Sequence, residues 1–227
     1  MNSTELEQKS TAWLKVRQGK ITASGVCDLM TSGRGKDELL GSTAMKYLME
    51  RFASGLVDYE PDITSAAMEW GNIHEADARD LYEQYIRDIT GNDHIEVIEL
   101  GFVPVDGFED IAGSSPDGVV YDYIGDEREP MGCIEIKCPF NSVMHTDTLL
   151  NKKIPDYYQK KYYAQCQMNM LTTGTTWCDF ISYDPRMTNP KHRLVVLRID
   201  RDDNFIEDLL MRLGKAKEIF EQWRKEL

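Results

Sequence analysis

Two stretches of the sequence decide its fold: SSPDG at residues 114–118 and IEIKCPF at residues 134–140. Pro-Asp-Gly predicts a tight corner between strands over 111–114 and 119–123, because proline and glycine supply the backbone conformations of a turn. The alternation in IEIK predicts a short strand over 133–137. Its isoleucines would face the core, with Glu135 and Lys137 on the opposite face. Several strands in succession favour an antiparallel ribbon.

The same stretches hold residues suited to metal-dependent chemistry. If the corner brings Asp117 beside Glu135, two hard oxygen ligands meet the ammonium of Lys137, which is what a Mg²⁺ or Mn²⁺ site acting on phosphate requires. The carbonyl of Ile136 is a candidate for a further oxygen ligand. Each stretch also has a structural interpretation, since Pro-Asp-Gly is a common turn and Glu-x-Lys can form an ion pair on a solvated strand face.

Hydrophobic periodicity predicts helices before and after these strands. Helical spacing indicates helices over 11–17 and 42–54, one that begins at 22–24, a long one from 64 to 90, another over 156–171 and a last one through 206–223. Alternation indicates further strands over 95–103, 176–183 and 194–199. We therefore expect an α+β fold with a central mixed β-sheet flanked by helices. A single domain over 1–227 is expected, with a helical part to about residue 90, a catalytic sheet core over about 91–200 and a C-terminal helix over about 201–227.

Composition argues against several functional classes. The 227 residues include 26 Lys and Arg against 39 Asp and Glu, a net charge of −13, which argues against a protein that coats DNA through a general basic surface. No run approaches the roughly 20 apolar residues of a membrane helix, and the N-terminus is polar, so we expect a cytoplasmic protein without a membrane partner. The five cysteines are scattered without a CxxC pair, which favours reduced thiols over a zinc site or an iron–sulfur cluster.

A third carboxylate is expected from the long upstream helix. Glu75 lies at the edge of the apolar stripe of that helix, from where it can reach the rim of the sheet. An exposed helical glutamate is the alternative interpretation. The adjacent His74 is either a further metal contact or a partly buried, hydrogen-bonded histidine.

The combination of these motifs resembles known nucleases. Asp117 with Glu135 and Lys137 has the form PD…(D/E)xK, which resembles the restriction-endonuclease-like nuclease superfamily. Six blocks in the same order resemble the phage lambda exonuclease family more specifically. They are WLKVR through ITAS at 13–24, EWG through EADAR at 69–79, SPDG at 115–118, EIKCPF at 135–140, AQCQ at 164–167 and YDPRM at 183–187.

This resemblance implies a restriction-endonuclease-like core and a processive, Mg²⁺-dependent exonuclease. Such an enzyme degrades the 5′-ended strand of double-stranded DNA to 5′-mononucleotides and leaves a 3′ single-stranded overhang for homologous recombination by strand annealing. The resemblance further implies a ring-shaped homotrimer, a single-strand annealing protein as partner, and a phage or prophage origin with action in the bacterial cytoplasm.

The matched motifs imply roles for individual residues. Asp117 and Glu135 would bind metal, with the Ile136 carbonyl as a further ligand. Glu75 would hold or position a second ion, and Lys137 would orient or activate the attacking water. Mg²⁺ is the expected ion, with Mn²⁺ as the alternative. The residues that match the grip on the terminal 5′ phosphate are Arg17, Ser24, Ser115 and Gln165.

The acidity of the chain requires that positive charge be segregated if it binds DNA. Arg34, in the loop after the second helix, matches a family residue that guides the separating strand. Nine basic residues fall into three local groups that could line one channel: Lys15, Arg17, Lys20, Arg34, Lys36, Lys152, Lys153, Lys160 and Lys161.

Two other functions are compatible with the sequence. An endonuclease of the same superfamily would use the same centre to cut DNA internally. A DNA-end-binding recombination adaptor that has lost catalysis would have no chemical need for Asp117, Glu135 and Lys137, so these residues argue against it.

Overall fold

The computed structural model describes residues 2–35, 38–58, 65–124 and 127–227, so Lys36 and the expected helix start at Thr64 lie outside it. Its α-helices are α1 (Thr11–Arg17), α2 (Val26–Leu29), α3 (Ser42–Ser54), α4 (Ala66–Thr90), α5 (Ser142–Asn151), α6 (Asp156–Thr173) and α7 (Asp203–Glu226). Its strands are β1 (Ile21–Thr22), β2 (Glu96–Ile98), β3 (Val103–Pro104), β4 (Ala112–Ser114), β5 (Gly118–Ile124), β6 (Glu127–Lys137), β7 (Trp177–Tyr183) and β8 (Leu194–Asp200). Short 3-10 turns are η1 (Ser3–Glu5), η2 (Ala23–Gly25) and η3 (Pro190–His192).

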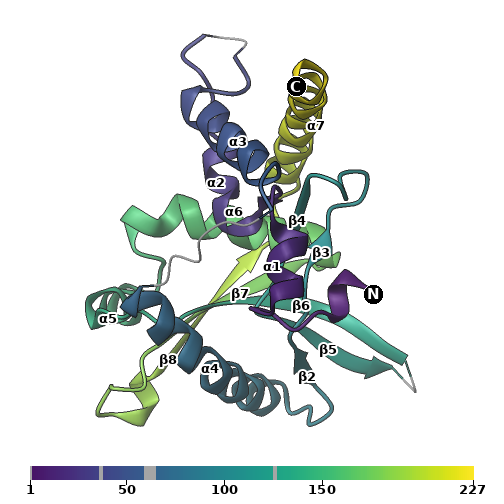
Figure 1. Ribbon diagram of the computed structural model, residues 1–227. Helices are drawn as coiled ribbons and strands as arrows, with labels where there is room; N and C mark the ends of the chain where they lie inside the picture. The colour runs from purple at the N-terminus through teal and green to yellow at the C-terminus, as the bar shows by residue number, and fades with distance from the viewer. Residues whose placement is uncertain (1, 36–37, 59–64, 125–126) are drawn as a thin grey trace.

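A mixed five-stranded sheet of order β2-β5-β6-β7-β8 forms the centre of the fold (Figure 1). Strand β6 is antiparallel to β5, with Gly118 opposite Ile134, and parallel to β7, with Glu135 opposite Phe180. The outer pairs are antiparallel. The predicted central mixed sheet is confirmed, and the corner at Pro-Asp-Gly leads directly into β5.

Helices cover both faces of this sheet. On one face, α4 packs its buried Tyr82 and Ile86 against Ile134 and Ile136 of β6. On the other face, α6 contributes to a cluster that includes Tyr162, Cys166, Met170, Cys133, Cys178 and Phe180. Because both faces are covered, the second half of β6, residues 132–136, is buried from both sides. The face that carries Glu135 therefore lies beneath α6 and is not solvated.

The five cysteines are free thiols in two environments. Cys133, Cys166 and Cys178 are fully buried where β6, α6 and β7 meet. Cys27 and Cys138 are partly exposed. Burial raises the pKa of the Cys178 thiol well above its ordinary value.

A smaller three-stranded sheet of order β1-β4-β3 joins the N-terminal helices to the centre. In it, β1 runs parallel to β4, with Ile21 opposite Ala112. Ile21 belongs to a buried cluster with Leu48 of α3, Met168 of α6 and Leu213 of α7. The C-terminal helix α7 thus packs beside α3, and both project from one end of the molecule (Figure 1).

Helix termini follow the capping residues of the sequence. The helices over 11–17 and 42–54 are confirmed with their predicted bounds. The long helix begins at Ala66, where Ser65 Oγ accepts the Met68 N–H at 3.3 Å. It ends at Thr90 because Gly91 adopts a left-handed conformation with φ of 67°.

The structure corrects the predicted strand over 95–103. This segment forms two short strands in different sheets, β2 and β3. Between them, the Gly101 N–H donates to Thr4 O at 2.9 Å and the Phe102 N–H donates to Ser3 O at 2.8 Å. The N-terminal segment thus takes over the hydrogen bonds that would have continued the strand.

Three further elements differ from the prediction. Strand β6 begins at Glu127 rather than at the predicted residue 133. Its first half is exposed and pairs with β5 in a ribbon, so it does not need the apolar alternation on which the prediction relied. Helix α5 and strand β1 were not predicted. Among the described residues, no helix has the length and apolar character needed to cross a membrane. The extent of the single domain, residues 1–227, stays a prediction.

Candidate active site

Asp117 and Glu135 meet at the junction of β5 and β6. Asp117 Oδ2 accepts the N–H of Ile136 at 2.6 Å, which places the Asp117 carboxylate beside strand β6, as the sequence predicts. The following Gly118 is closely packed, because a Cβ there would lie 2.8 Å from Val97 Cγ1 and 3.0 Å from Ile134 Cδ1. The tight pairing of β5 with β6 therefore fixes the position of the Asp117 corner.

Glu135 is only 1% exposed, and both of its carboxylate oxygens have partners. Oε1 accepts a hydrogen bond from Lys137 Nζ, and Oε2 accepts one from Asn169 Nδ2 of α6 at 2.9 Å. The ammonium of Lys137 also lies 5.1 Å from the ring centroid of Tyr162. The predicted shared face of Glu135 and Lys137 is confirmed.

The charges of this centre perturb one another. Desolvation, followed by the charges of Glu135 and Glu75, raises the pKa of Asp117 well above its ordinary value. Burial alone would lower the pKa of Lys137, but the charges of Glu135 and Asp117 outweigh it and raise that pKa. Several buried carboxylates that repel one another favour the binding of cations.

Glu75 approaches the centre from α4. Its side chain is 16% exposed, which excludes the alternative of a freely solvated helical glutamate. Glu75 accepts hydrogen bonds from Lys9 Nζ at 3.1 Å and from Arg79 at 3.2 Å. Arg79 also donates to the carbonyl of Asp117 at 2.7 Å and forms an ion pair with Glu99 at 2.6 Å. Arg79 therefore joins Glu75 to the Asp117 corner.

The donor set fits a hard divalent cation. Within the described residues, no three His, Cys, Asp or Glu side chains converge closely enough to form a ready metal cage. Glu135 and Glu75 are nevertheless close enough to Asp117 for their charges to raise its pKa, and oxygen ligands suit Mg²⁺. Asn169 adds a buried Oδ1 that has no hydrogen-bond partner in the described part of the chain. An oxygen-liganded ion would satisfy these groups.

His74 differs from the expectation of a hydrogen-bonded histidine. Its Nδ1 is buried without a hydrogen-bond partner among the described residues, and it lies 3.8 Å from Asp77 Oδ2. The His74 ring packs on Trp70 with centroids 4.1 Å apart.

Two of the residues predicted to bind phosphate are linked through Trp13. The guanidinium of Arg17 stacks over the Trp13 ring at 4.1 Å, and Trp13 Nε1 donates to Ser115 Oγ at 2.9 Å. Burial lowers the pKa of Arg17 to about 10, against the opposing charges of Tyr47, Asp117 and Glu135. Arg17 and Ser115 thus lie next to the carboxylate centre.

Ser24 and Gln165 lie on elements that pack together. Ser24 is exposed in η2, with its Oγ 3.2 Å from Thr22 Oγ1, and η2 packs on α6. It lies inside the 3-10 turn rather than at the cap of α2, which is Gly25. Gln165 is 8% exposed on α6, one turn before Asn169. One face of α6 therefore connects the carboxylate centre with this region.

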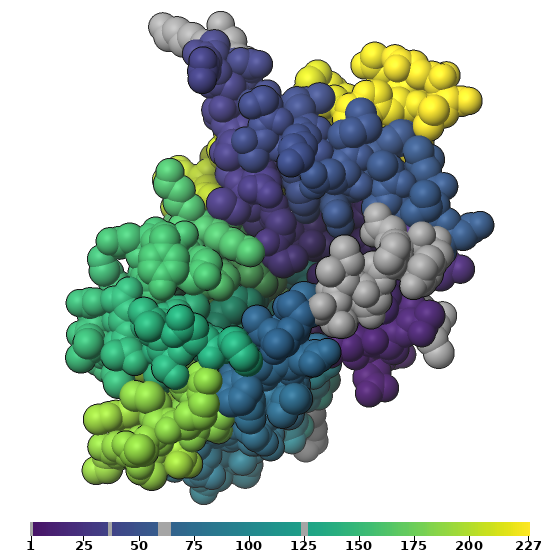
Figure 2. Space-filling view, turned by 60° about the vertical axis from the view of Figure 1, so that its left-hand side comes forward, coloured from purple at the N-terminus to yellow at the C-terminus, as the bar shows by residue number. Residues whose placement is uncertain are grey.

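Arg34 is exposed in the loop between α2 and α3. Figure 1 shows this loop extending away from the central sheet. In Figure 2, the purple N-terminal residues, the blue residues of α4 and the green residues after β6 meet on one face of the molecule. The strand-guiding role of Arg34 stays a prediction.

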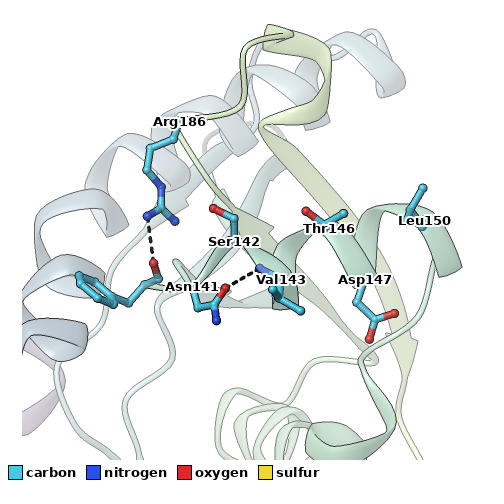
Figure 3. A pocket seen from close by; sticks show the side chains of 8 residues that line it. Asn141, Ser142, Val143, Thr146, Asp147, Leu150 and Arg186 are labelled. Carbon is cyan, nitrogen blue, oxygen red and sulfur yellow. Dashed lines mark hydrogen bonds between the residues drawn. The ribbon is translucent and has the colours of Figure 1, made fainter.

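An open pocket of about 810 Å³ lies beside the segment that follows β6 (Figure 3). Its lining consists of Phe140, Asn141, Ser142, Val143, Thr146, Asp147, Leu150 and Arg186. Arg186 spans its rim, donating to Phe140 O at 2.9 Å, and its guanidinium lies 4.4 Å from the Trp70 ring centroid. No predicted site residue lines this pocket, so it does not contain the carboxylate centre.

The sequence did not reveal three residues that support the centre. Asn169 lies within the predicted helix over 156–171, and no local pattern places it beside Glu135. Arg79 stands four residues after Glu75, a spacing that signals a helical ion pair. Gln8 holds the corner by donating to Pro116 O at 3.0 Å, a contact across the chain without a local signal.

Comparisons with known proteins agree with this geometry. Residues 12–176 match the model of the YqaJ-like viral recombinase domain. An uncharacterized protein of Acanthamoeba polyphaga mimivirus is 26% identical over 180 residues, which are 78% of this chain. The matched residues make up 29% of the length of that relative, so the chain spans only part of it.

Solved structures share the fold. The alkaline exonuclease of Laribacter hongkongensis is 31% identical, with a TM-score of 0.71 over 96% of this chain and 97% of that one. The same enzyme in complex with dAMP gives a TM-score of 0.72 over the same shares of both chains, also at 31% identity. A phage-related exonuclease of Haemophilus somnus 129PT is 18% identical, with a TM-score of 0.63 over 91% of this chain and 96% of that one, which supports the fold.

These matches confirm the predicted restriction-endonuclease-like fold and the resemblance to the phage lambda exonuclease family. The 31% identity with the alkaline exonuclease over almost the whole length of both chains also supports a nuclease. The match to the domain model covers well over half of the sequence. The chain therefore belongs to the YqaJ-like viral recombinase family.

Proposed function

We propose that this protein is a Mg²⁺-dependent exonuclease that degrades the 5′-ended strand of double-stranded DNA to 5′-mononucleotides. The product would be a 3′ single-stranded overhang for phage-type recombination by strand annealing. The observation that carries the proposal is the meeting of Asp117, Glu135 and Lys137 at the C-terminal end of the central strand β6. The similarity to an alkaline exonuclease supports it.

The carboxylates of Asp117, Glu135 and Glu75 and the carbonyl of Ile136 would hold two divalent ions, with Mn²⁺ as the alternative to Mg²⁺. Such ions lower the pKa of water and neutralise charge on phosphate. Lys137 Nζ, held in place by Glu135, orients the attacking water and stabilises developing negative charge. Asn169 fixes the carboxylate plane of Glu135 from the side of α6.

Arg17, Ser24, Ser115 and Gln165 would hold the terminal 5′ phosphate of the DNA. A guanidinium donates two parallel hydrogen bonds to phosphate, and its stacking on Trp13 fixes the orientation of Arg17. Arg34 would guide the separating strand. A fixed end phosphate sets the distance from the DNA end to the scissile bond, which accounts for mononucleotide products.

The assembly and partners are part of the same proposal. A ring-shaped homotrimer would enclose the duplex and reduce the need for a strongly basic surface on a chain of charge −13. A single-strand annealing protein would receive the overhang in the bacterial cytoplasm. Light scattering of the purified protein tests the trimer, and a mass of one or two chains would contradict it.

The decisive test follows the two ends of linear duplex DNA. Separate 5′ and 3′ labels are monitored over time with Mg²⁺ and with EDTA. We expect metal-dependent release of the 5′ label as mononucleotide, while the 3′-labelled strand shortens only from its far end. Closed circular duplex should resist cleavage, because an exonuclease requires an end.

Matched variants locate the chemistry. Glu135→Gln should abolish cleavage, whereas Glu129→Gln, at an exposed position of the same strand, should not. Discrete internal fragments or cleavage of closed circles would favour the endonuclease. Binding of DNA ends without cleavage would favour the recombination adaptor.

A further inference from the structure

Arg51 of α3 lies beside Arg17 of α1, where the two helices meet at their C-terminal ends. Gln18 Nε2 donates to Ser54 O at 2.8 Å and to Val57 O at 2.7 Å, which locks the end of α1 onto the end of α3. The approach of the two chains is so close that a Cβ on Gly19 would lie 2.7 Å from the Cα of Gly55 and 3.6 Å from Arg51 O. The backbone of residues 17–19 is therefore held against that of residues 51–55.

The surroundings of Arg51 connect it to Ser24. The Arg51 guanidinium lies 5.7 Å from the centroid of the Tyr47 ring. The Tyr47 hydroxyl accepts the N–H of Thr22 at 3.2 Å, and Thr22 Oγ1 lies 3.2 Å from Ser24 Oγ. Tyr47 thus stands between the guanidinium of Arg51 and the hydroxyls of the η2 segment.

Neither arginine has an anionic partner in the described part of the chain. Arg51 Nε is buried and has no hydrogen-bond partner there. No salt bridge to a carboxylate forms at Arg17 or Arg51 among the described residues. The positive charge of Arg51 contributes to the lowered pKa of Arg17. Two neighbouring cations with unused donors, among them the buried Nε of Arg51, favour the binding of an anion that carries more than one charge.

We propose that Arg51 is a second arginine of the 5′-phosphate pocket and that the pair Arg17 and Arg51 selects a terminal phosphate monoester. This inference rests on the proposed function and adds the basis of its end specificity. A phosphate monoester carries about −1.5 to −2 charges at pH 7, whereas an internal phosphodiester carries one. Two guanidiniums match the monoester, and a 5′-hydroxyl end offers neither the charge nor the acceptor oxygens.

The test measures end binding without cleavage. Fluorescence anisotropy in EDTA gives the Kd of a short duplex with a 5′ phosphate and of the same duplex with a 5′ hydroxyl. The selectivity is the ratio of the two constants. Arg51→Gln removes the charge, Arg51→Lys keeps it without the fork of donors, and Lys46→Gln is the control on the same helix, where the side chain is 79% exposed.

We expect Arg51→Gln to reduce the selectivity about tenfold, which corresponds to the loss of one charge-assisted hydrogen bond. Arg51→Lys should retain part of the selectivity, and Lys46→Gln should leave it unchanged. Circular dichroism checks that each variant is folded. If Arg51→Gln does not fold, the test relies on Arg51→Lys.

A wild-type protein that does not distinguish the two ends would overturn the inference. Arg51→Gln and Arg51→Lys with wild-type selectivity, beside an Arg17→Ala variant that has lost it, would also overturn it. Because the assay requires no cleavage, it decides on Arg51 even if the nuclease assay fails. Conversely, cleavage from 5′ ends by a protein without end selectivity would leave the exonuclease activity standing and remove the 5′-phosphate pocket together with Arg51.

Discussion

Replacing Lys137 by methionine tests whether its ammonium compensates the buried charge of Glu135. Methionine has a similar length and no charge, so it retains much of the packing on Tyr162. Glu135 is 1% exposed and would keep only Asn169 as a hydrogen-bond donor. Removing one partner of a buried ion pair costs about 3–5 kcal/mol, because it leaves an uncompensated charge. The Lys137 side chain is 25% exposed, so we expect the lower end of this range, about 3 kcal/mol at pH 7 without metal.

Lys153→Met provides the matched control. Lys153 Nζ lies 2.7 Å from Asp156 Oδ1, but the two side chains are 53% and 84% exposed. Solvent screens such a pair, so its loss should change the free energy of unfolding little. The two substitutions remove the same group from an ion pair and differ mainly in burial.

The assay is urea unfolding in EDTA, monitored by tryptophan fluorescence. For a chain of this size, a loss of 3 kcal/mol corresponds to a decrease in Tm of about 6–12 °C. Added Mg²⁺ should restore more stability to Lys137→Met than to the wild type, because the ion takes over the compensation of Glu135. Cleavage should be lost while DNA binding persists. Equal destabilisation by Lys137→Met and Lys153→Met would refute the electrostatic argument, and retention of most cleavage would refute the role assigned to Lys137.

Three further predictions follow from contacts elsewhere in the fold. Arg17→Ala should lower the preference for 5′-phosphorylated over 5′-hydroxyl ends in a competition of the two substrates, and an unchanged preference would remove Arg17 from the phosphate pocket. Burial alone would raise the pKa of Asp184, but hydrogen bonds that include those from a neighbouring arginine outweigh it and lower the pKa from 3.8 to about 2. The ionised Asp184 therefore stabilises the folded protein fully above pH 4, and this stabilisation is lost as the pH falls toward 2. Asp184→Asn should lower the free energy of unfolding, measured in urea, by about 2 kcal/mol at pH 7 and by about half of that at pH 3. A cost that does not depend on pH would contradict this assignment. Gly132→Ala should destabilise the protein by about 1–3 kcal/mol, because its Cβ would lie closer than 3.0 Å to the Trp177 ring. Gly214→Ala should stabilise the protein, because Gly214 has open space around it in α7. Thermal melts that rank the two variants in the opposite order would refute the packing argument.

The sequence predicts those parts of the fold that local periodicity and capping determine. Helices α1 and α3 have their predicted bounds because hydrophobic spacing, together with the Ser10 cap at α1, acts within a few residues. The core orientation of Ile134 and Ile136 follows from strand alternation. By contrast, the division of 95–103 into β2 and β3 depends on hydrogen bonds between Gly101 and Thr4, which are distant in sequence. Local patterns contain no information on such contacts.

The candidate site divides in the same way. Asp117, Glu135 and Lys137 are predictable because a turn and an alternating strand place them within one hairpin. Glu75 is predictable only in part, since its helix face is periodic while its approach to Asp117 depends on tertiary packing. The contact of Asn169 with Glu135 crosses from α6 to β6, and only the three-dimensional structure reveals it.

The arrangement of the cysteines allows unfolding of the protein to be followed by the labelling of its own thiols. Cys27 and Cys138 are partly exposed, so a thiol reagent can reach them under native conditions, although burial raises the pKa of both thiols and slows the reaction. Cys133, Cys166 and Cys178 are fully buried between β6, α6 and β7, so they should react only when the central sheet opens. The labelling rate of these three thiols, compared with their rate in urea, therefore gives the opening free energy of the layer that carries Glu135, without any introduced probe.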